Sequence, residues 1–421
     1  MRGRNASGAA PNRIVVGLDI GTTKTCCIIA TMDANRNITI MGIGTAENDG
    51  MARGTVTNIE RTVNSIRMAV QRAEKQSGIK VHAVNVGIAG DHIQSFQSRG
   101  VIAINNPDNE ITRKDIERLI QDTKRVNLPP DRKIIHVIPQ EYIVDGQDGI
   151  YNPEGISGVR LEGHVHIITG SLTAVQNIYK CVERAGFEVN ELILEPLASS
   201  YAVLDEEEKE VGIVLVDIGG GTTDIAVFED RTIRHTAVLA VAGKKVTEDI
   251  RKVLGILNED AEKLKREHGC AYLPEVVHDT PILLRGYGGR KPVEISRSLL
   301  CQIIQPRMEE ILEIVGLEIK RSGYSKHLHS GVVLTGGGAL ISGTTSLARE
   351  VLGMPVKLGI PSGFSAGLVS ETENPMYSTC VGLVLHDFKK EDAVDVSPSS
   401  SPAGMVMRMF SQIRDWFREQ L

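Results

Sequence analysis

Hydrophobic residues near the N-terminal end of the chain occur in three short runs, which polar turns separate. The runs cover 14–18, 25–30 and 38–43, and the turn after the first run contains Gly-Thr-Thr. Short apolar runs bounded by glycine and polar residues are typical of β-strands. The pattern therefore predicts a meander of three strands at the start of the fold.

Residues 58–76 have a different periodicity, with Ile59, Val63, Ile66 and Val70 spaced to lie on one helical face. A glycine ends this helix, and another apolar run predicts a fourth strand. Strands that alternate with a helix in this way indicate an α/β fold.

Changes in this pattern suggest where the chain divides. From about residue 91 a strong helix signal, a Pro-Pro pair and short strands predict a small inserted α+β module, after which core-like strands and helices resume. A charged stretch rich in serine and proline near the C-terminus has little to bury and reads as a linker. The expected parts are a disordered lead (1–12), the first half of the core (13–90 and 164–208), the inserted module (91–163), the second half (209–240 and 330–388) with an outer subdomain (241–329), a linker (389–402) and a C-terminal helix (403–421).

The most informative feature is an internal repeat. VVGLDIGTTKTCCIIA near residue 20 is similar to VLVDIGGGTTDIAVFE about 200 residues later. In both copies an aspartate, Asp19 or Asp217, ends an apolar strand and is followed by Ile-Gly, a turn, Thr-Thr and a second strand. The repeat predicts a duplicated α/β domain with two matching hairpins that face each other.

These hairpins suit an ATP site. Glycines allow backbone N–H groups to approach an anion closely, and threonine hydroxyls add donors. Asp19 and Asp217 could hold Mg²⁺ through its bound waters. A third glycine turn suits the nucleoside end of the ligand. The expected ligand contacts are Asp19, Gly21, Thr22, Thr23 and Lys24 in the first hairpin, Asp217, Gly219, Gly220, Gly221, Thr222 and Thr223 in the second, and Gly336, Gly337 and Gly338 in the third turn.

Two other phosphate-binding motifs do not fit the sequence. A Walker A loop needs GxxxxGK[ST], but Lys24 follows Thr-Thr rather than glycine. A dinucleotide fingerprint needs GxGxxG at the start of a helix, whereas these glycines lie between predicted strands.

Five segments together resemble the superfamily of actin, heat-shock chaperones and sugar kinases. They are two phosphate loops at 17–25 and 217–224, an adenosine loop at 334–340, and connecting helices at 195–199 and 374–385. The resemblance implies a duplicated actin-like ATPase fold. It also implies that Glu195 orients the attacking water and that Glu262 and Lys265 flank the ribose.

Within that superfamily the chain resembles the FtsA family of bacterial division proteins. The inserted module carries VDGQDGIYNPEGISGVRLEG, and the outer subdomain carries EHGCA and RSLLCQIIQPRMEEI, which are similar to segments of that family. The resemblance implies weak or absent ATP hydrolysis, self-assembly into filaments, and other division proteins bound at the inserted module. It also implies a site for the C-terminal peptide of FtsZ on 241–329, where Arg297 and Arg307 are candidates.

The tail has a physical argument of its own. In 403–421, apolar residues recur at offsets that place them on one helical face, with most charged residues elsewhere. Such a helix is marginal alone in water and binds a membrane surface reversibly. A linker of about 14 residues would reach roughly 20 Å. The expected membrane-facing residues are Val406, Met409, Phe410, Ile413, Trp416 and Phe417.

Composition and charge narrow the alternatives. A net charge of −6 argues against nucleic acid as a partner. No apolar run approaches the roughly 20 residues that span a bilayer, and the first residues lack the apolar core of a secretory signal. We therefore expect a cytosolic chain that contacts any membrane from the inside. The resemblance to the FtsA family implies a place on the cytoplasmic face of the inner membrane, at the division septum. A sugar kinase and a pilus-assembly adaptor remain as alternatives; neither of them needs this tail.

Overall fold

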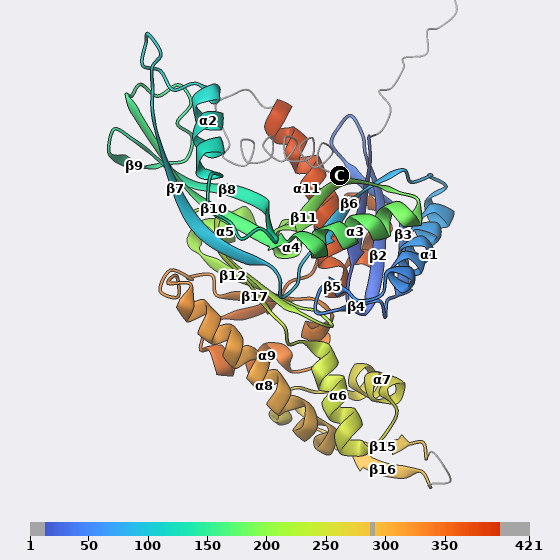
Figure 1. The fold of residues 1–421 in the computed structure, drawn as a ribbon. Coiled ribbons are helices and arrows are strands. Elements are labelled where there is room, and N and C mark those ends of the chain that lie inside the picture. Colours follow the sequence, from blue (N-terminus) through green and yellow to red (C-terminus); the bar gives the residue numbers. More distant parts are fainter. Residues whose placement is uncertain (1–12, 287–290, 396–421) are drawn as a thin grey trace, which may run out of the picture.

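Two α/β halves and a smaller third module make up the molecule (Figure 1). The structure is a computed structural model that describes residues 13–286 and 291–395. The predicted lead, the membrane-facing residues and residues 396–402 of the predicted linker lie outside the described residues. The prediction of a linker from 389 is wrong for 389–395, because these residues continue the helix Ser378–Asp395. Within them, no helix is long and apolar enough to cross a membrane.

The first half is built on a six-stranded sheet of order β11-β6-β1-β2-β3-β19. The predicted meander is confirmed, because the first three strands pair antiparallel in sequence order. Two later strands then add parallel to β1 and β6. The bounds of the five main strands are β1 Arg13–Ile20, β2 Lys24–Met32, β3 Ile38–Glu47, β6 Ala83–Ile88 and β11 Glu188–Leu194.

Helices α1 and α3 are among the helices that pack against this sheet. Helix α1 covers Ile59–Ser77. Asn58 caps its N-terminus, where its side chain accepts a hydrogen bond from the Arg61 N–H, and Gly78 caps its C-terminus in the left-handed conformation. Its predicted apolar face is confirmed, since Val63, Ile66 and Val70 are buried. Helix α3, Leu172–Ala185, packs beside α1.

The second half repeats this topology. Its sheet has the order β14-β13-β12-β17-β18, again an antiparallel meander followed by parallel strands. The predicted duplication is therefore confirmed. Its strands are β12 Ile213–Ile218, β13 Thr223–Glu229, β14 Thr232–Leu239, β17 Val332–Thr335 and β18 Val356–Leu358, and its main helices are α6 Gly243–Leu254, α7 Asn258–His268, α8 Arg297–Arg321 and α9 Thr344–Leu352.

The inserted module is a four-stranded sheet covered by one helix. The strand order is β7-β10-β8-β9, and α2, Arg113–Thr123, packs on β7 and β10. Gly100 and Gly163 pair across these strands directly beneath α2. A Cβ atom at Gly163 would lie 2.8 Å from Leu119, so glycine here lets the helix approach the sheet. The strands are β7 Gln94–Ala103, β8 Arg132–Val144, β9 Gln147–Ile150 and β10 Arg160–Ser171.

The sequence analysis placed the end of this module near 163, but β10 passes through that position and continues to Ser171. Gly163 therefore lies inside a strand rather than at a turn. Its role in packing against α2 has no signature in the local sequence.

Two helices connect the halves. Helix α4, Glu195–Val203, leads from the first half to the second, and α11, Ser378–Asp395, leads back onto β1. They cross at Gly382, where an added Cβ would lie only 1.9 Å from the Ala198 carbonyl oxygen. The remaining elements are β4 Met51–Ala52, β5 Thr55–Val56, α5 Glu206–Val211, η1 Leu273–Glu275, β15 Pro281–Leu284, β16 Val293–Ser296, η2 Gly337–Leu340, β19 Ala366–Gly367, α10 Val369–Thr372 and η3 Pro375–Tyr377.

Candidate functional site

The two repeated hairpins contact each other across the two halves. A Cβ added at Gly220 would lie 2.5 Å from the Thr23 side chain, and one at Gly221 would lie 2.5 Å from Thr22 Oγ1. Any larger residue at these positions would push the two turns apart. The glycines thus permit the direct approach of the hairpins that the repeat suggested.

The two turns also have the same internal geometry. The Gly21 N–H donates to the Lys24 carbonyl at 2.9 Å, and the Gly219 N–H donates to the Thr222 carbonyl at the same distance. Asn48 supports the first turn by donating its side-chain amide to the Gly21 carbonyl. The sequence similarity between the repeats is therefore a similarity of backbone hydrogen bonding.

The third glycine turn lies against the second hairpin. Gly336 has φ +83°, and an added Cβ would lie 2.2 Å from Asp217 Oδ1. A Cβ at Gly337, in contrast, would have no heavy atom within 4 Å. The first glycine is needed for packing, whereas the backbone at the second is open to an approaching ligand.

Four carboxyl groups come together at these turns: those of Asp19, Glu195, Asp217 and Asp224. Burial raises the pKa of Asp19 to about 6, and the charge of Asp217 adds to this while Lys24 opposes it. Burial and the same neighbour raise the pKa of Asp224 to about 8. Removal from water and the three aspartates raise the pKa of Glu195 well above its usual range. The cluster thus repels its own negative charge and would be stabilised by a cation.

Both connecting helices hold Asp217 in place. Its Oδ2 accepts hydrogen bonds from Ser199 Oγ of α4 at 3.0 Å and from Thr379 Oγ1 of α11 at 3.4 Å. Burial raises the pKa of Asp217, and these two bonds and Lys24 oppose that shift. The central carboxylate is therefore fixed by the same helices that join the two halves.

Lys24 lies on the α11 side of the site. Its Nζ donates to the Met376 carbonyl at 2.5 Å and stands 4.5 Å from the centre of the Tyr377 ring. Its positive charge still acts on Asp19 and Asp217.

Glu262 and Lys265 form an ion pair beside the second hairpin. Lys265 Nζ lies 2.6 Å from Glu262 Oε2 and also donates to the Gly243 carbonyl and to Thr247 Oγ1. The Gly243 N–H in turn donates to the Gly219 carbonyl. Burial raises the pKa of Glu262, but its bonds to Lys265 and other neighbours outweigh this and keep the group ionised.

The carboxyl cluster fits a hydrated cation better than a directly bound one. In the parts of the chain that the structure describes, no group of three or more His, Cys, Asp or Glu side chains is arranged to hold a metal ion. Asp224 Oδ1 is buried and has no hydrogen-bond partner among those residues. A Mg²⁺ ion that keeps its waters could satisfy such an atom through a bound water.

Four residues of the site were not named individually as candidates from the sequence, although three of them lie in segments that the resemblance covers. Asp224 faces Asp217 across the β12–β13 pair, and its place in the second hairpin could have suggested it. Lys244 joins the halves by donating from Nζ to the Thr22 carbonyl at 2.9 Å. No motif around Ser199 or Thr379 in the sequence indicated that their hydroxyls would contact Asp217.

The two predicted partner-binding arginines both lie on α8. Arg307 pairs with Asp249 at 2.6 Å and also with Glu310. The buried Nε of Arg297 has no hydrogen-bond partner within the described residues.

Comparisons with known proteins assign the chain to a family. The profile described as "Cell division protein FtsA" matches residues 214–382, and that described as "SHS2 domain inserted in FTSA" matches 90–169. The FtsA of Pseudomonas aeruginosa is 43% identical over 390 residues, which cover 92% of this chain and 93% of that protein. This chain belongs to the FtsA family of cell division proteins. Other FtsA proteins agree, with 39% identity in Borreliella burgdorferi and 38% in Escherichia coli, each covering 97% of this chain and 98% or 99% of the relative.

Solved structures confirm the actin-like fold of this FtsA-family chain. The PilM–PilN type IV pilus biogenesis complex matches with a TM-score of 0.67 and 16% identity, covering 90% of this chain and 99% of that one. MreB5 of Spiroplasma citri bound to ADP matches with a TM-score of 0.55 and 13% identity, covering 91% and 99%. The SHS2 match confirms that an inserted domain is present.

Proposed function

We propose that this FtsA-family protein binds Mg-ATP between its two halves, assembles into filaments, and tethers FtsZ to the cytoplasmic face of the inner membrane at the division septum. Membership of the family supports the division role. The observation that carries the nucleotide proposal is the contact between the two glycine hairpins, with four carboxyl groups beside it.

Different residues of the site would bind different parts of the ligand. Backbone N–H groups of the glycine turns would bind phosphate oxygens, and Asp19 and Asp217 would hold Mg²⁺ through its waters. When bound, the ion would offset both the charge of the phosphates and the repulsion within the carboxyl cluster. Structures of the same fold bound to ADP and to AMPPNP support a nucleotide as the ligand.

Glu195 is the candidate for orienting water at the phosphate. Burial and the neighbouring aspartates raise its pKa, which disfavours the ionised form when no cation is bound. We propose that hydrolysis is weak or absent, as the resemblance to the FtsA family implies. Glu262 and Lys265, fixed beside the second hairpin, remain the candidates for the ribose.

Partner contacts follow from the family and from the fold. The MamK double helical filament, with a TM-score of 0.50, supports self-assembly by this fold. For the FtsZ C-terminal peptide on 241–329, Arg297 is a better candidate than Arg307, because ion pairs with Asp249 and Glu310 already occupy Arg307. Other division proteins would bind the inserted module, and lipid would bind the C-terminal helix.

Binding of a fluorescent ATP analogue tests the nucleotide proposal. We expect binding that requires Mg²⁺ and is weakened at least about tenfold by Asp217→Asn, because the variant loses a carboxylate that holds the hydrated ion. The exposed Asp148→Asn is the matched control and should bind like the unmodified chain. Absence of binding by the unmodified chain at millimolar Mg-ATP would rule the proposal out.

A further inference from the structure

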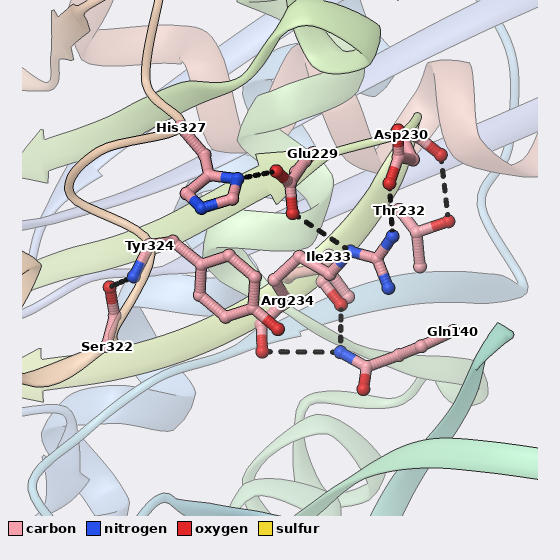
Figure 2. Close-up of polar contacts among 9 residues, drawn as sticks. All are labelled: Gln140, Glu229, Asp230, Thr232, Ile233, Arg234, Ser322, Tyr324 and His327. Atoms are coloured by element: carbon pink, nitrogen blue, oxygen red, sulfur yellow. Dashed lines mark hydrogen bonds and ion pairs between the residues drawn. The ribbon is translucent and has the colours of Figure 1, made fainter. Parts of the chain in front are cut away.

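The inserted module, which belongs to the first half by sequence, is also held by the second half. Strand β14 forms one edge of the second sheet and lies beside β7, β8 and β10 of the module. Gln140 on β8 is 4% exposed, and its Nε2 donates to the carbonyl oxygens of Ile233 at 2.9 Å and Arg234 at 3.3 Å (Figure 2). A buried amide therefore satisfies two successive carbonyls of an edge strand.

A β-bulge explains why both carbonyls are available to one side chain. Val227 pairs with His235 and Phe228 pairs with Ile233, so Arg234 has no partner on β13. An extra residue of this kind leaves its backbone unpaired and turns the strand locally. In a regular strand, successive carbonyls would point in opposite directions.

Ion pairs within the second half fix the bulge. Arg234 lies 2.7 Å from Asp230 and 3.8 Å from Glu229, and Glu229 accepts from His327 Nδ1 at 2.6 Å (Figure 2). The backbone that Gln140 recognises is thus held by the hairpin itself and by the segment that follows α8.

Two further strands of the module, β7 and β10, add one contact each. Ser95 Oγ on β7 donates to the Thr236 carbonyl at 3.0 Å, and His166 Nε2 on β10 lies 3.1 Å from Thr236 Oγ1. Burial and the neighbouring His235 lower the pKa of His166 to about 4, so this imidazole is neutral at physiological pH. All three strands therefore contribute polar contacts to one stretch of β14.

The far end of β14 leads directly into the nucleotide site. Thr223 Oγ1 of the second hairpin donates to the Val241 carbonyl at 2.7 Å. Two residues after Val241, the Gly243 N–H donates to the Gly219 carbonyl. The next residue, Lys244, donates from Nζ to the Thr22 carbonyl. A shift of the hairpin would therefore be passed along a single strand to the bulge.

The module also contacts the first half next to the site. His136 Nε2 on β8 accepts the backbone N–H of Leu194 at 2.9 Å, and the next residue is Glu195. Because Gln140 lies on the same strand, β8 links the start of α4 to the bulge of β14.

We propose that the inserted module is coupled to nucleotide binding through the contact of Gln140 with the Arg234 bulge of β14. The inference rests on the proposed Mg-ATP site. A module anchored on both halves responds to any change in their spacing. Thermodynamic coupling is reciprocal, so the contact must influence ATP affinity if ATP influences the contact.

Gln140→Leu tests the proposal, because it removes both donors at similar volume. The matched control is Gln147→Leu, which changes an exposed glutamine on β9 of the same module. Affinity for a fluorescent ATP analogue with Mg²⁺ is measured alongside hydrogen exchange of residues 232–239 with and without ATP. We expect ATP to slow exchange in this stretch of the unmodified chain and of Gln147→Leu. Gln140→Leu should lose that effect and bind ATP at least fivefold more weakly.

A second, milder variant tests whether any change seen with Gln140→Leu comes from misfolding of that variant. Thr236→Val removes the hydroxyl that contacts His166 but keeps the carbonyl that Ser95 uses, and it should shift both measurements in the same direction by less. Equal ATP affinity and equal exchange in all four proteins would overturn the coupling while leaving the nucleotide site intact. Absence of ATP binding by the unmodified chain would instead overturn the proposed function and the coupling with it.

Discussion

The carboxyl groups of Asp19, Glu195, Asp217 and Asp224 destabilise one another when no ligand separates them. Burial raises the pKa of Asp19 by more than the charge of Lys24 lowers it. In the free protein, repulsion between these carboxyl groups destabilises the site, and binding of Mg²⁺ would offset that repulsion. At the residue scale, the proposed affinity for Mg-ATP and the repulsion within the empty site would therefore have one cause.

This argument predicts how stability depends on pH without nucleotide and Mg²⁺. The pKa values of Asp19 and Asp224 are raised to about 6 and about 8 in the folded chain, against about 4 in the unfolded chain. Between these values the folded state binds more protons, so stability falls as pH rises from about 4 to about 8. Melting temperatures across this range should show the fall, and Asp224→Asn should raise the value at pH 8 by about 2–4 °C.

The exposed Asp148→Asn serves as the control, because its carboxyl group lies outside the cluster. An unchanged melting temperature for Asp224→Asn at pH 8 would contradict the prediction. With saturating Mg-ATP, the unmodified chain and Asp148→Asn should both melt at a higher temperature than Asp224→Asn, since they keep the full carboxyl cluster.

At the scale of elements, the crossing of α4 and α11 determines how the halves are joined. Gly382 lets α11 touch the Ala198 backbone. Gly17 lets β1 approach the same helix, because a Cβ added there would lie only 2.7 Å from the Cys380 carbonyl oxygen. Ser199 and Thr379, one on each helix, hold Asp217 close to this crossing. Close backbone packing thus positions the central carboxylate.

Replacing Gly382 should therefore destabilise the fold. Gly382→Ala places a Cβ 1.9 Å from a carbonyl oxygen and should destabilise the fold by about 1–3 kcal/mol or more, despite the better helix propensity of alanine. Gly316→Ala in α8 is the matched control, because its Cβ would meet only the flexible end of Leu352 at 3.3 Å. That change should be neutral or stabilising by up to about 1 kcal/mol. Urea unfolding measures both, and an equal effect of the two would contradict the packing argument.

At the scale of the whole molecule, the first strand and the last helix are tied together. Arg13 pairs with Asp387 at 3.2 Å, and its guanidinium lies 5.6 Å from the centre of the Phe388 ring. Lys389 pairs with Glu206 and lies over the Tyr201 ring. Helix α11, which extends to Asp395 within the predicted linker range, is therefore anchored on the first half and would transmit a membrane attachment to the core.

Flotation with anionic vesicles, ATP and FtsZ tests this attachment. We expect the full chain to carry FtsZ to the vesicles, and a chain ending at Ser401 to carry neither protein. Trp416→Glu should reduce vesicle binding at least about tenfold, because it places a charge on the predicted apolar face, and should leave ATP binding unchanged. Ser411→Glu adds the same charge to the opposite face of the predicted helix and should retain most of the binding. Equal flotation of the full and shortened chains would remove the proposed anchor.

The order of the main elements and the two facing hairpins could be predicted from the sequence. Apolar periodicity identified the first meander and α1, and the repeated Asp-Ile-Gly segments predicted the duplication that the sheets confirm. These features are local, or they repeat along the chain, so they leave a pattern in the order of residues.

The partners of the site residues were decided by the tertiary structure. Ser199 and Thr379 reach Asp217 from helices that lie 180 residues apart, and Lys24 contacts Met376 across 352 residues. Gly163 and Gly382 looked like ordinary glycines until the approaching helices were known. The sequence by itself determined which segments fold into strands, helices and glycine turns, because short-range periodicity and backbone freedom control those choices. Only the tertiary structure decided which turns and helices meet, because long-range packing has no counterpart in local sequence.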